Sequence, residues 1–119
     1  MSLYCASKTK HAWRWRQLRS SGVQVISTWI DEAEAGQTSD FADLWIRCVK
    51  EAAEADWLLV YREPEEILKG AFIEVGAALV ARTAVIAVGC DEFSWTKHPM
   101  VLIKPDLESA LAFIRKTTS

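Results

Sequence analysis

The fold is decided by residues 57–82, which read WLLVYREPEEILKGAFIEVGAALVAR. The stretch begins with a continuous apolar run, Trp57–Tyr61, which is typical of a strand in the centre of a parallel sheet. A charged loop follows, and Lys69–Arg82 then has the composition of a buried helix. Glu74 is the only charged side chain between the two ends of that helix. Because burying an ionised carboxylate without partners is costly, Glu74 is a candidate functional residue.

Strand patterns and helix patterns alternate along the rest of the chain. Short apolar or β-branched runs predict further strands at residues 3–6, 23–27, 84–88 and 101–104. Helical patterns are predicted at residues 11–21, 41–52 and 106 to about 115. This order predicts a single α/β domain over residues 1–119. We expect a flavodoxin-like or Rossmann-like three-layer sandwich with a five-stranded parallel sheet, in the order 2-1-3-4-5.

A sheet of this kind binds ligands outside the carboxyl ends of its strands, where the strand order reverses. Ser7 follows the first strand, Trp29 and Asp31 follow the second, and Arg62 follows the third. We expect all four near one crevice, with Trp29 either stacking on a ligand or packing into the core. Gly70 faces the same crevice from the start of the Glu74 helix and lets the backbone approach a ligand closely.

Composition excludes several classes of protein. Half of the 119 residues are hydrophobic, a quarter are charged, and the net charge of −2 gives no support for binding a nucleic-acid duplex or an anionic membrane. No apolar run approaches the roughly 20 residues of a membrane span, and the first residues lack a signal-peptide pattern. Three widely spaced cysteines favour a reducing, cytoplasmic setting. We expect no metal and no cofactor, and we expect the two histidines, His11 and His98, at the surface without partners.

Three short motifs, taken together, resemble the nucleoside 2-deoxyribosyltransferase family, which includes deoxynucleotide N-hydrolases. The family's motif around its glutamate, Gly-Thr-x-x-Glu-Ile-Gly-Tyr-Ala, is similar to residues 70–78, Gly-Ala-Phe-Ile-Glu-Val-Gly-Ala-Ala. Its first strand is similar to residues 3–7, Leu-Tyr-Cys-Ala-Ser, and its Ala-Asp pair before the third strand to residues 55–56. The shared order and spacing cover residues 3 to about 90. Gly76 would permit tight packing of the helix on the sheet.

The resemblance implies cleavage or transfer of the N-glycosidic bond of a nucleoside or a nucleoside 5′-monophosphate. Glu74 would attack the anomeric carbon and form a glycosyl-enzyme ester in a retaining double displacement. Tyr4 would hydrogen-bond this nucleophile. Ser7, Lys8 and Arg14, in and beyond the loop after the first strand, would hold the sugar or its 5′-phosphate, which favours a nucleotide over a free nucleoside.

Two positions depart from the family pattern. Relatives carry aspartates two residues before the glycine of the glutamate motif and eight residues before the third-strand aspartate, and these positions hold Leu68 and Cys48 here. A general acid would then come from the loop after the third strand. Glu66 is the preferred candidate, with Glu63 and Glu65 as alternatives, because it would lie one turn before Gly70 in an early-starting helix.

Two further functions stay open from the sequence. One is a non-catalytic nucleotide-binding protein on the same fold, and the other is an NAD-cleaving domain similar to the Toll/interleukin-receptor type. The Glu74 helix is apolar around nearly its whole circumference, which predicts burial on all sides. In so small a domain this indicates a homodimer or higher oligomer in which a neighbouring subunit completes the site. The base, the sugar and the choice between hydrolysis and transfer are not specified by the sequence.

Overall fold

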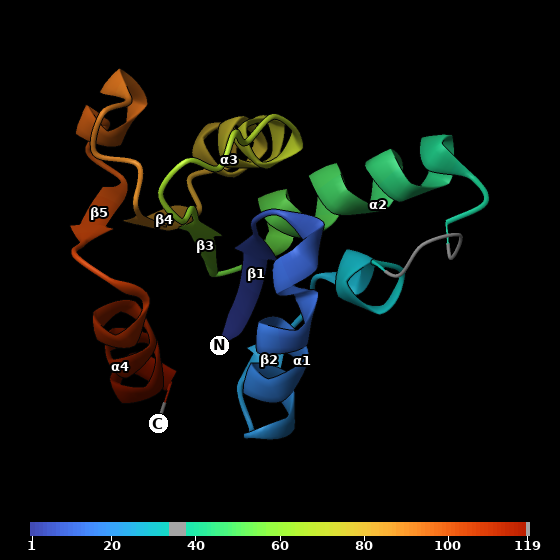
Figure 1. Ribbon diagram of the computed structural model, residues 1–119, viewed down its shortest axis with the longest axis horizontal. Helices are drawn as coiled ribbons and strands as arrows, with labels where there is room; N and C mark the ends of the chain where they lie inside the picture. Colours follow the sequence, from blue (N-terminus) through green and yellow to red (C-terminus); the bar gives the residue numbers. More distant parts are fainter. Residues whose placement is uncertain (34–37, 119) are drawn as a thin grey trace.

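Five parallel strands form one sheet in the order β2-β1-β3-β4-β5 in the computed structural model, which describes residues 1–33 and 38–118. The strands are β1 (Ser2–Ala6), β2 (Gln24–Val25), β3 (Trp57–Tyr61), β4 (Ala84–Val88) and β5 (Val101–Lys104). The described helices are α1 (Ala12–Ser20), α2 (Phe41–Glu54), α3 (Gly70–Val80) and α4 (Leu107–Thr118), with 3-10 turns at Thr9–His11, Thr28–Asp31 and Ser94–Lys97. Helices α2 and α3 cover one face of the sheet and α1 and α4 the other (Figure 1). The predicted fold class and strand order are confirmed.

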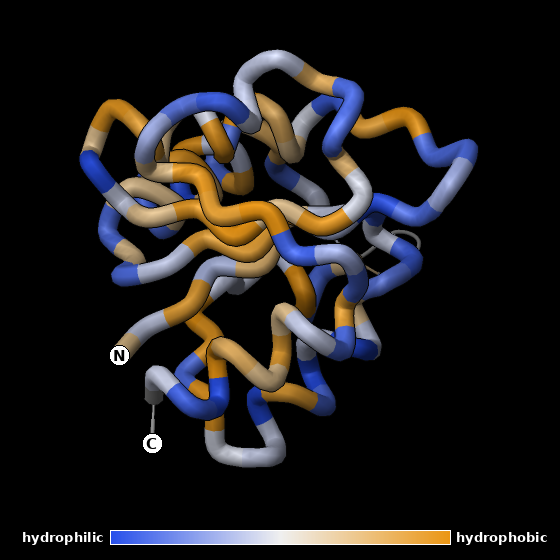
Figure 2. The backbone as a smooth tube through the Cα atoms, turned by 90° about the vertical axis from the view of Figure 1, so that its left-hand side faces the viewer, coloured by the Kyte–Doolittle hydropathy of each residue, from blue (hydrophilic) through white to orange (hydrophobic). Residues whose placement is uncertain are grey.

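The core lies on and around the three central strands, β1, β3 and β4. In the parallel register Tyr4 pairs with Leu58, and Leu58 pairs with Val85, and these three side chains are fully buried. Hydrophobic residues accordingly concentrate along the strands in the middle of the molecule (Figure 2). Burial on both faces explains why Trp57–Tyr61 is apolar throughout instead of alternating.

Strand β2 is shorter than the predicted run 23–27. It pairs with β1 through Gln24 and Val25 only, because it is an edge strand and the chain leaves the sheet immediately after it. The Ser27 hydroxyl accepts a hydrogen bond from the Cys5 amide at 3.1 Å, so a side chain satisfies the β1 backbone where the strand pairing ends.

Two helix ends bear on the predictions. The Asp40 side chain accepts a hydrogen bond from the Asp43 amide at 3.1 Å and caps α2. Asp106 does the same for α4 through the Ser109 amide at 2.7 Å, and α4 runs three residues beyond the predicted end at Arg115. None of the described helices has the length and apolar character needed to cross a bilayer.

Helix α3 is buried on one side only within a single chain. Ala71, Val75 and Ala78 face the core, whereas Ile73 and Val80 are 57% and 88% exposed. Gly76 lies on the same exposed side, and a Cβ atom there would meet nothing within 4 Å, so the expectation that it permits tight helix–sheet packing is wrong.

Candidate functional site

Glu74 lies one turn into α3 with its side chain directed at β1. It is only 8% exposed, and the Tyr4 hydroxyl, from the middle of β1, donates a hydrogen bond to its Oε2. The two residues meet because α3 packs over the central strands and Tyr4 points out of the sheet on that side. The Tyr4–Glu74 contact implied by the family resemblance is therefore present in this structure.

The surroundings of Glu74 favour its protonated form more than water does. Burial raises the pKa of Glu74 from its ordinary value of 4.5 to about 7, the Tyr4 hydrogen bond lowers it by less, and the nearby Glu51 charge raises it further. Burial, and then the Glu74 carboxylate, raise the pKa of Tyr4 far above its usual range, so Tyr4 remains a hydrogen-bond donor. A carboxyl that titrates near neutral pH can act as a nucleophile or take part in proton transfer.

An open cavity of about 300 Å³ adjoins Glu74. Its lining comes from the loop after β1, from the 3-10 turn that follows β2, from α2, and from the segment that leads into α3. The lining residues are Ser7, Lys8, Thr9, Trp29, Leu44, Trp45, Cys48, Ile67, Leu68, Lys69, Gly70, Ala71 and Glu74. Glu74 is the only carboxylate that the described part of the chain contributes to this wall.

Two lysines give the cavity its positive charge. Lys8 comes from the loop after β1 and Lys69 immediately precedes α3, and both are exposed. The amino end of α3 adds the partial positive charge of its unpaired N–H groups at Gly70 and Ala71, both of which line the cavity. The cavity therefore combines an attraction for anions with a carboxyl group held at low exposure.

The ring of Trp45 packs against the backbone of Gly70. A Cβ atom at Gly70 would lie 2.7 Å from Cη2 of Trp45, so the missing side chain admits the indole ring of α2. Trp45 is partly exposed and lines the cavity, which offers a flat apolar surface to a planar ligand. The sequence does not mark Trp45 as a site residue. Its position three residues before Cys48 in the predicted helix 41–52 is the signal that both face this wall.

Ser7 and Trp29 both line the cavity, but their polar groups are already engaged. The Ser7 hydroxyl accepts from Trp15 Nε1 at 2.9 Å and donates to the Lys8 carbonyl at 2.9 Å. The Trp29 indole N–H donates to the Cys5 carbonyl at 2.8 Å, and the ring is buried. Ser7 thus has no proton left for a ligand, and Trp29 contributes a wall.

Two of the predicted binding residues lie away from the cavity. Asp31 makes a bidentate ion pair with Arg19, with N–O distances of 2.8 and 2.9 Å. Arg62 donates to the Gly89 carbonyl at 3.0 Å and to Glu92 at 2.8 Å, on the far side of the β3 loop. Both side chains are held by partners that the sequence does not reveal, so neither reaches the Glu74 wall.

The preferred general acid, Glu66, and the expected phosphate ligand, Arg14, are also outside the cavity. Glu66 is buried against His11, with 2.8 Å between its Oε2 and the imidazole Nε2. Arg14 contacts Glu63 at 3.3 Å and donates to His11 Nδ1 at 3.2 Å. Helix α3 starts at Gly70, so Glu66 lies in the preceding turn instead of the helix. The expectation that His11 lies at the surface without a partner is wrong, because it is 3% exposed and hydrogen-bonded at both nitrogens.

His98 is exposed as expected, although its Nδ1 accepts a hydrogen bond from the Met100 amide at 3.0 Å. Cys48 and Leu68, which occupy the positions of the family's aspartates, both line the cavity. Burial raises the pKa of the Cys48 thiol to about 11, so this group is neutral at physiological pH. The wall around Glu74 is therefore apolar or neutral at the two places where relatives carry acids.

Comparison with protein-family models and with curated proteins finds no match for this sequence. Among solved structures, the chain is similar to the CMP N-glycosidase BcmB of Clostridium botulinum, with a TM-score of 0.60 and 13% sequence identity. The alignment covers 98% of this chain and 99% of that chain. The two proteins share a fold over their whole length.

Proposed function

We propose that this protein cleaves the N-glycosidic bond of a nucleoside 5′-monophosphate, with Glu74 as the nucleophile. The observation that carries the proposal is the buried Glu74 carboxyl, hydrogen-bonded by Tyr4, on the wall of a cavity that two lysines also line. The CMP N-glycosidase that shares the fold supports the same class of bond. The resemblance to nucleoside 2-deoxyribosyltransferases supports it through the residues around Glu74.

The reaction begins with attack of a Glu74 carboxylate oxygen on the anomeric carbon of the sugar. The electron pair of the carbon–nitrogen bond leaves with the base, and a glycosyl ester of Glu74 forms. Water, or a second base in a transfer reaction, then attacks the same carbon and releases Glu74. The Tyr4 hydroxyl orients the carboxylate and limits its movement between these two steps.

The lysines favour a substrate with a phosphate. Lys8 and Lys69 reach the cavity from two different segments, and the α3 amino end lies between the lysines and Glu74 in the sequence. A 5′-phosphate bound there would place the attached sugar beside the Glu74 wall. The indole of Trp45 would then be available to stack on the base.

A second candidate substrate follows from the absence of a second acid. The described residues of the cavity wall contain no carboxylate besides Glu74, and a positioned general acid is worth about 10²–10⁴-fold in rate. A pyridinium base leaves as a neutral molecule and needs no proton. We therefore infer that nicotinamide nucleotides belong among the candidate substrates, beside nucleotides with ordinary bases that would draw their proton from water.

A substrate panel tests the function directly. The wild-type protein is incubated with ribo- and deoxyribonucleoside monophosphates, the matching nucleosides, NAD and nicotinamide mononucleotide, and free base is measured by chromatography. We expect base release from a monophosphate, and none with the Glu74→Ala protein. Binding without release from any compound would instead identify a non-catalytic nucleotide-binding protein. Release that is unaffected by Glu74→Ala would refute the assignment of the nucleophile.

Replacing Lys8 tests the role given to the phosphate. Lys8→Ala removes one charge–phosphate contact, which we expect to raise KM for the monophosphate about tenfold, equivalent to about 1.4 kcal/mol. The KM for the corresponding nucleoside should stay within about twofold, because it lacks the phosphate that the charge attracts. Steady-state kinetics on the two substrates measure this difference. Equal losses on both would show that Lys8 does not contact the phosphate.

We also infer that the exposed side of α2 and α3 packs against a second copy of the chain. The exposed apolar side chains of these two helices are Phe41, Trp45, Ile46, Val49, Ile73 and Val80. The helices pack against each other on one face of the sheet (Figure 1) and border the cavity. A second copy seated there would cover this apolar surface and narrow the cavity mouth, which agrees with the composition of the Glu74 helix.

Val80→Glu tests this interface, because Val80 is 88% exposed in the single chain. We expect the wild-type protein to sediment at twice the 13.4 kDa chain mass, and Val80→Glu to sediment as a monomer. Trp13→Glu is the matched control, since Trp13 is an exposed apolar residue on α1, across the sheet. A wild-type monomer at micromolar concentration would refute the interface.

A further inference from the structure

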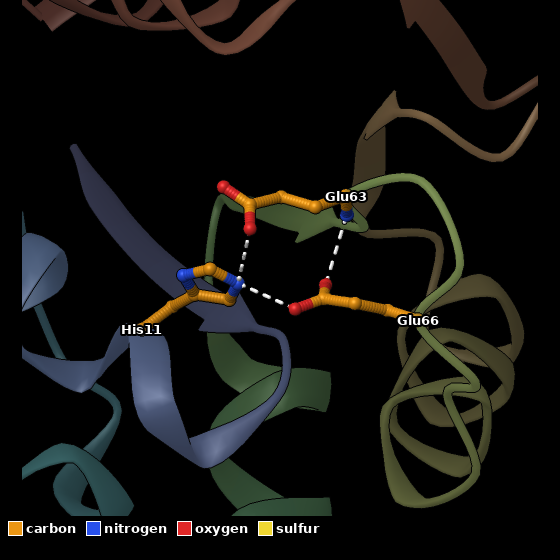
Figure 3. A group of neighbouring side chains, drawn as sticks. All are labelled: His11, Glu63 and Glu66. Atoms are coloured by element: carbon orange, nitrogen blue, oxygen red, sulfur yellow. Dashed lines mark hydrogen bonds and ion pairs between the residues drawn. The ribbon is translucent and has the colours of Figure 1, made fainter.

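A buried hydrogen-bond cluster lies beside the cavity and is not used by the proposed chemistry. His11, which follows β1, points at two glutamates of the segment after β3 (Figure 3). Its Nε2 lies 2.8 Å from Oε2 of Glu66 and 3.6 Å from Oε1 of Glu63. The Tyr61 ring packs edge-on against the imidazole, with 5.0 Å between the ring centres. We use "the His11 cluster" for His11, Glu63 and Glu66.

Glu66 is the centre of this cluster and is held from three sides. Its Oε1 accepts from the Glu63 amide at 2.8 Å, and its Oε2 contacts His11 Nε2 at 2.8 Å and Lys10 Nζ at 3.3 Å. Burial raises the pKa of Glu66, but the hydrogen bonds from the Glu63 amide, His11 and Lys10 outweigh it and leave the pKa below its ordinary value. Glu66 is thus a fixed carboxylate acceptor.

The backbone also directs Glu66 inward. Residues 63–66 form a turn closed by a hydrogen bond of 3.1 Å from the Glu66 amide to the Glu63 carbonyl. Pro64 occupies the second position and Glu65 the third, with a φ of 73°, a conformation that usually requires glycine. A non-glycine residue in this region persists when its surroundings fix it, and the anchored Glu66 side chain does so here.

The three side chains also have the composition of a metal site, with ligand atoms all within 4.8 Å of one another. Arg14 argues against that use. Its Nε–H donates to His11 Nδ1 at 3.2 Å, so Nδ1 must be the acceptor and the imidazole proton must lie on Nε2. A metal bound to Nε2 would move this proton to Nδ1, where it would face the Arg14 N–H, so two donors would oppose each other. A ligating histidine normally donates from its second nitrogen to an acceptor.

The His11 cluster joins the two segments that bring lysines to the cavity. The loop that carries Lys8 continues directly into His11, and the His11 amide donates to the Lys8 carbonyl at 3.1 Å. Glu66 is followed within three residues by Lys69 and then by α3. The hydrogen bond between His11 and Glu66 therefore links two residues that are 55 apart in sequence. They belong to the segments that follow the carboxyl ends of β1 and β3.

We propose that His11 is a positioning residue that holds Lys8 and Lys69 at the separation needed to bind a phosphate, by donating from Nε2 to Glu66. This role rests on the proposed function, since it concerns the phosphate of that substrate. His11 touches neither the cavity nor Glu74, so it acts on binding and not on the attack of Glu74.

The test compares two substitutions of His11 in the full chain. His11→Ala removes the link, and we expect KM for the monophosphate to rise about tenfold with kcat within about twofold, and KM for the nucleoside to stay unchanged. His11→Gln restores the link, because its amide NH₂ can donate to Glu66 and its carbonyl can accept from Arg14. We expect its KM to lie within about threefold of the wild-type value.

Glu66→Gln provides a second route if His11→Ala does not fold. Either orientation of the glutamine amide sets its NH₂ against a donor, Nε2–H of His11 or the Glu63 N–H, so the anchored cluster is weakened. This substitution should therefore raise KM for the monophosphate as His11→Ala does. The same comparison can be made without turnover. Each substitution at His11 or Glu66 is combined with Glu74→Gln, and binding of a nucleoside monophosphate is measured by tryptophan fluorescence. The positioning role can thus be tested even if base release, and with it the proposed function, fails.

The ¹⁵N NMR signals of His11 give a readout independent of substrate. We expect the pattern of a neutral imidazole protonated at Nε2, and no change when Zn²⁺ is added. Three results would overturn the proposal: a proton on Nδ1, a zinc-dependent shift of these signals, or His11→Gln behaving like His11→Ala toward the monophosphate. Equal effects of His11→Ala on nucleoside and nucleotide would also overturn it.

Discussion

Glu74→Gln will reduce base release at least about 10³-fold, a loss of about 4 kcal/mol of transition-state stabilisation. Glutamine has nearly the same shape, and its amide oxygen can still accept the Tyr4 hydrogen bond, so the site should keep its geometry. An amide oxygen is, however, a far weaker nucleophile than a carboxylate and carries no charge to stabilise a positively charged sugar. The measurement is kcat/KM for the best monophosphate of the substrate panel.

A covalent intermediate separates this mechanism from direct attack by water. With a slow substrate, the wild-type protein should gain the mass of the sugar phosphate in an intact-mass spectrum, and Glu74→Gln should not. Glu51→Gln is the control, because Glu51 lies near Glu74 but bonds Thr28 outside the cavity. Glu51→Gln should retain activity. Full activity in Glu74→Gln would exclude Glu74 as the nucleophile.

The sequence predicts the elements whose residues are buried on both sides. The bounds of β3 and β4, which are buried on both sides, agree with the predicted ranges, because their apolar runs stop where the chain leaves the sheet. The bounds of β5 also agree, although β5 is an edge strand and is partly exposed. The contact between Tyr4 and Glu74, which the family resemblance implies, joins one such strand to the helix α3. Strand β2 differs because its pairing with β1 stops after Val25, although β1 continues to Ala6, and the Ser27 hydroxyl accepts from the Cys5 amide there. A run of β-branched residues does not reveal where such pairing stops.

The less predictable parts of the site are those that depend on side-chain partners far apart in sequence. The sequence predicts Asp31 as a binding residue and Glu66 as a general acid, whereas in the folded chain Arg19 pairs with Asp31 and His11 contacts Glu66. Trp45 reached the cavity because Gly70 leaves room for its ring. Such pairs are set by rotamers and packing in the folded chain, and a charged loop residue has many possible partners before folding.

Ionisation of Glu74 will lower the stability of the wild-type protein by about 3 kcal/mol as pH rises from about 4 to 8, and Glu74→Gln will remove this loss. The pKa of Glu74 is about 7 in the folded chain, against an ordinary value of 4.5, mainly because of burial. Between these values the folded protein binds more protons than the unfolded chain, so the free energy of unfolding decreases with rising pH. Below both values the protonated carboxyl contributes no such loss.

Urea unfolding at a series of pH values measures this effect as the difference between the two proteins. The difference between their free energies of unfolding should be independent of pH below about pH 4. It should then grow in favour of Glu74→Gln as pH rises to about 7. The lowered pKa of Glu66 acts in the opposite sense, adding stability that is lost at acid pH, and it cancels because both proteins retain it. Parallel curves would show that Glu74 is not desolvated in the folded chain. Divergence would show that the ionised form needed for attack is also the form that destabilises the fold, which is expected of a carboxylate kept for chemistry instead of stability.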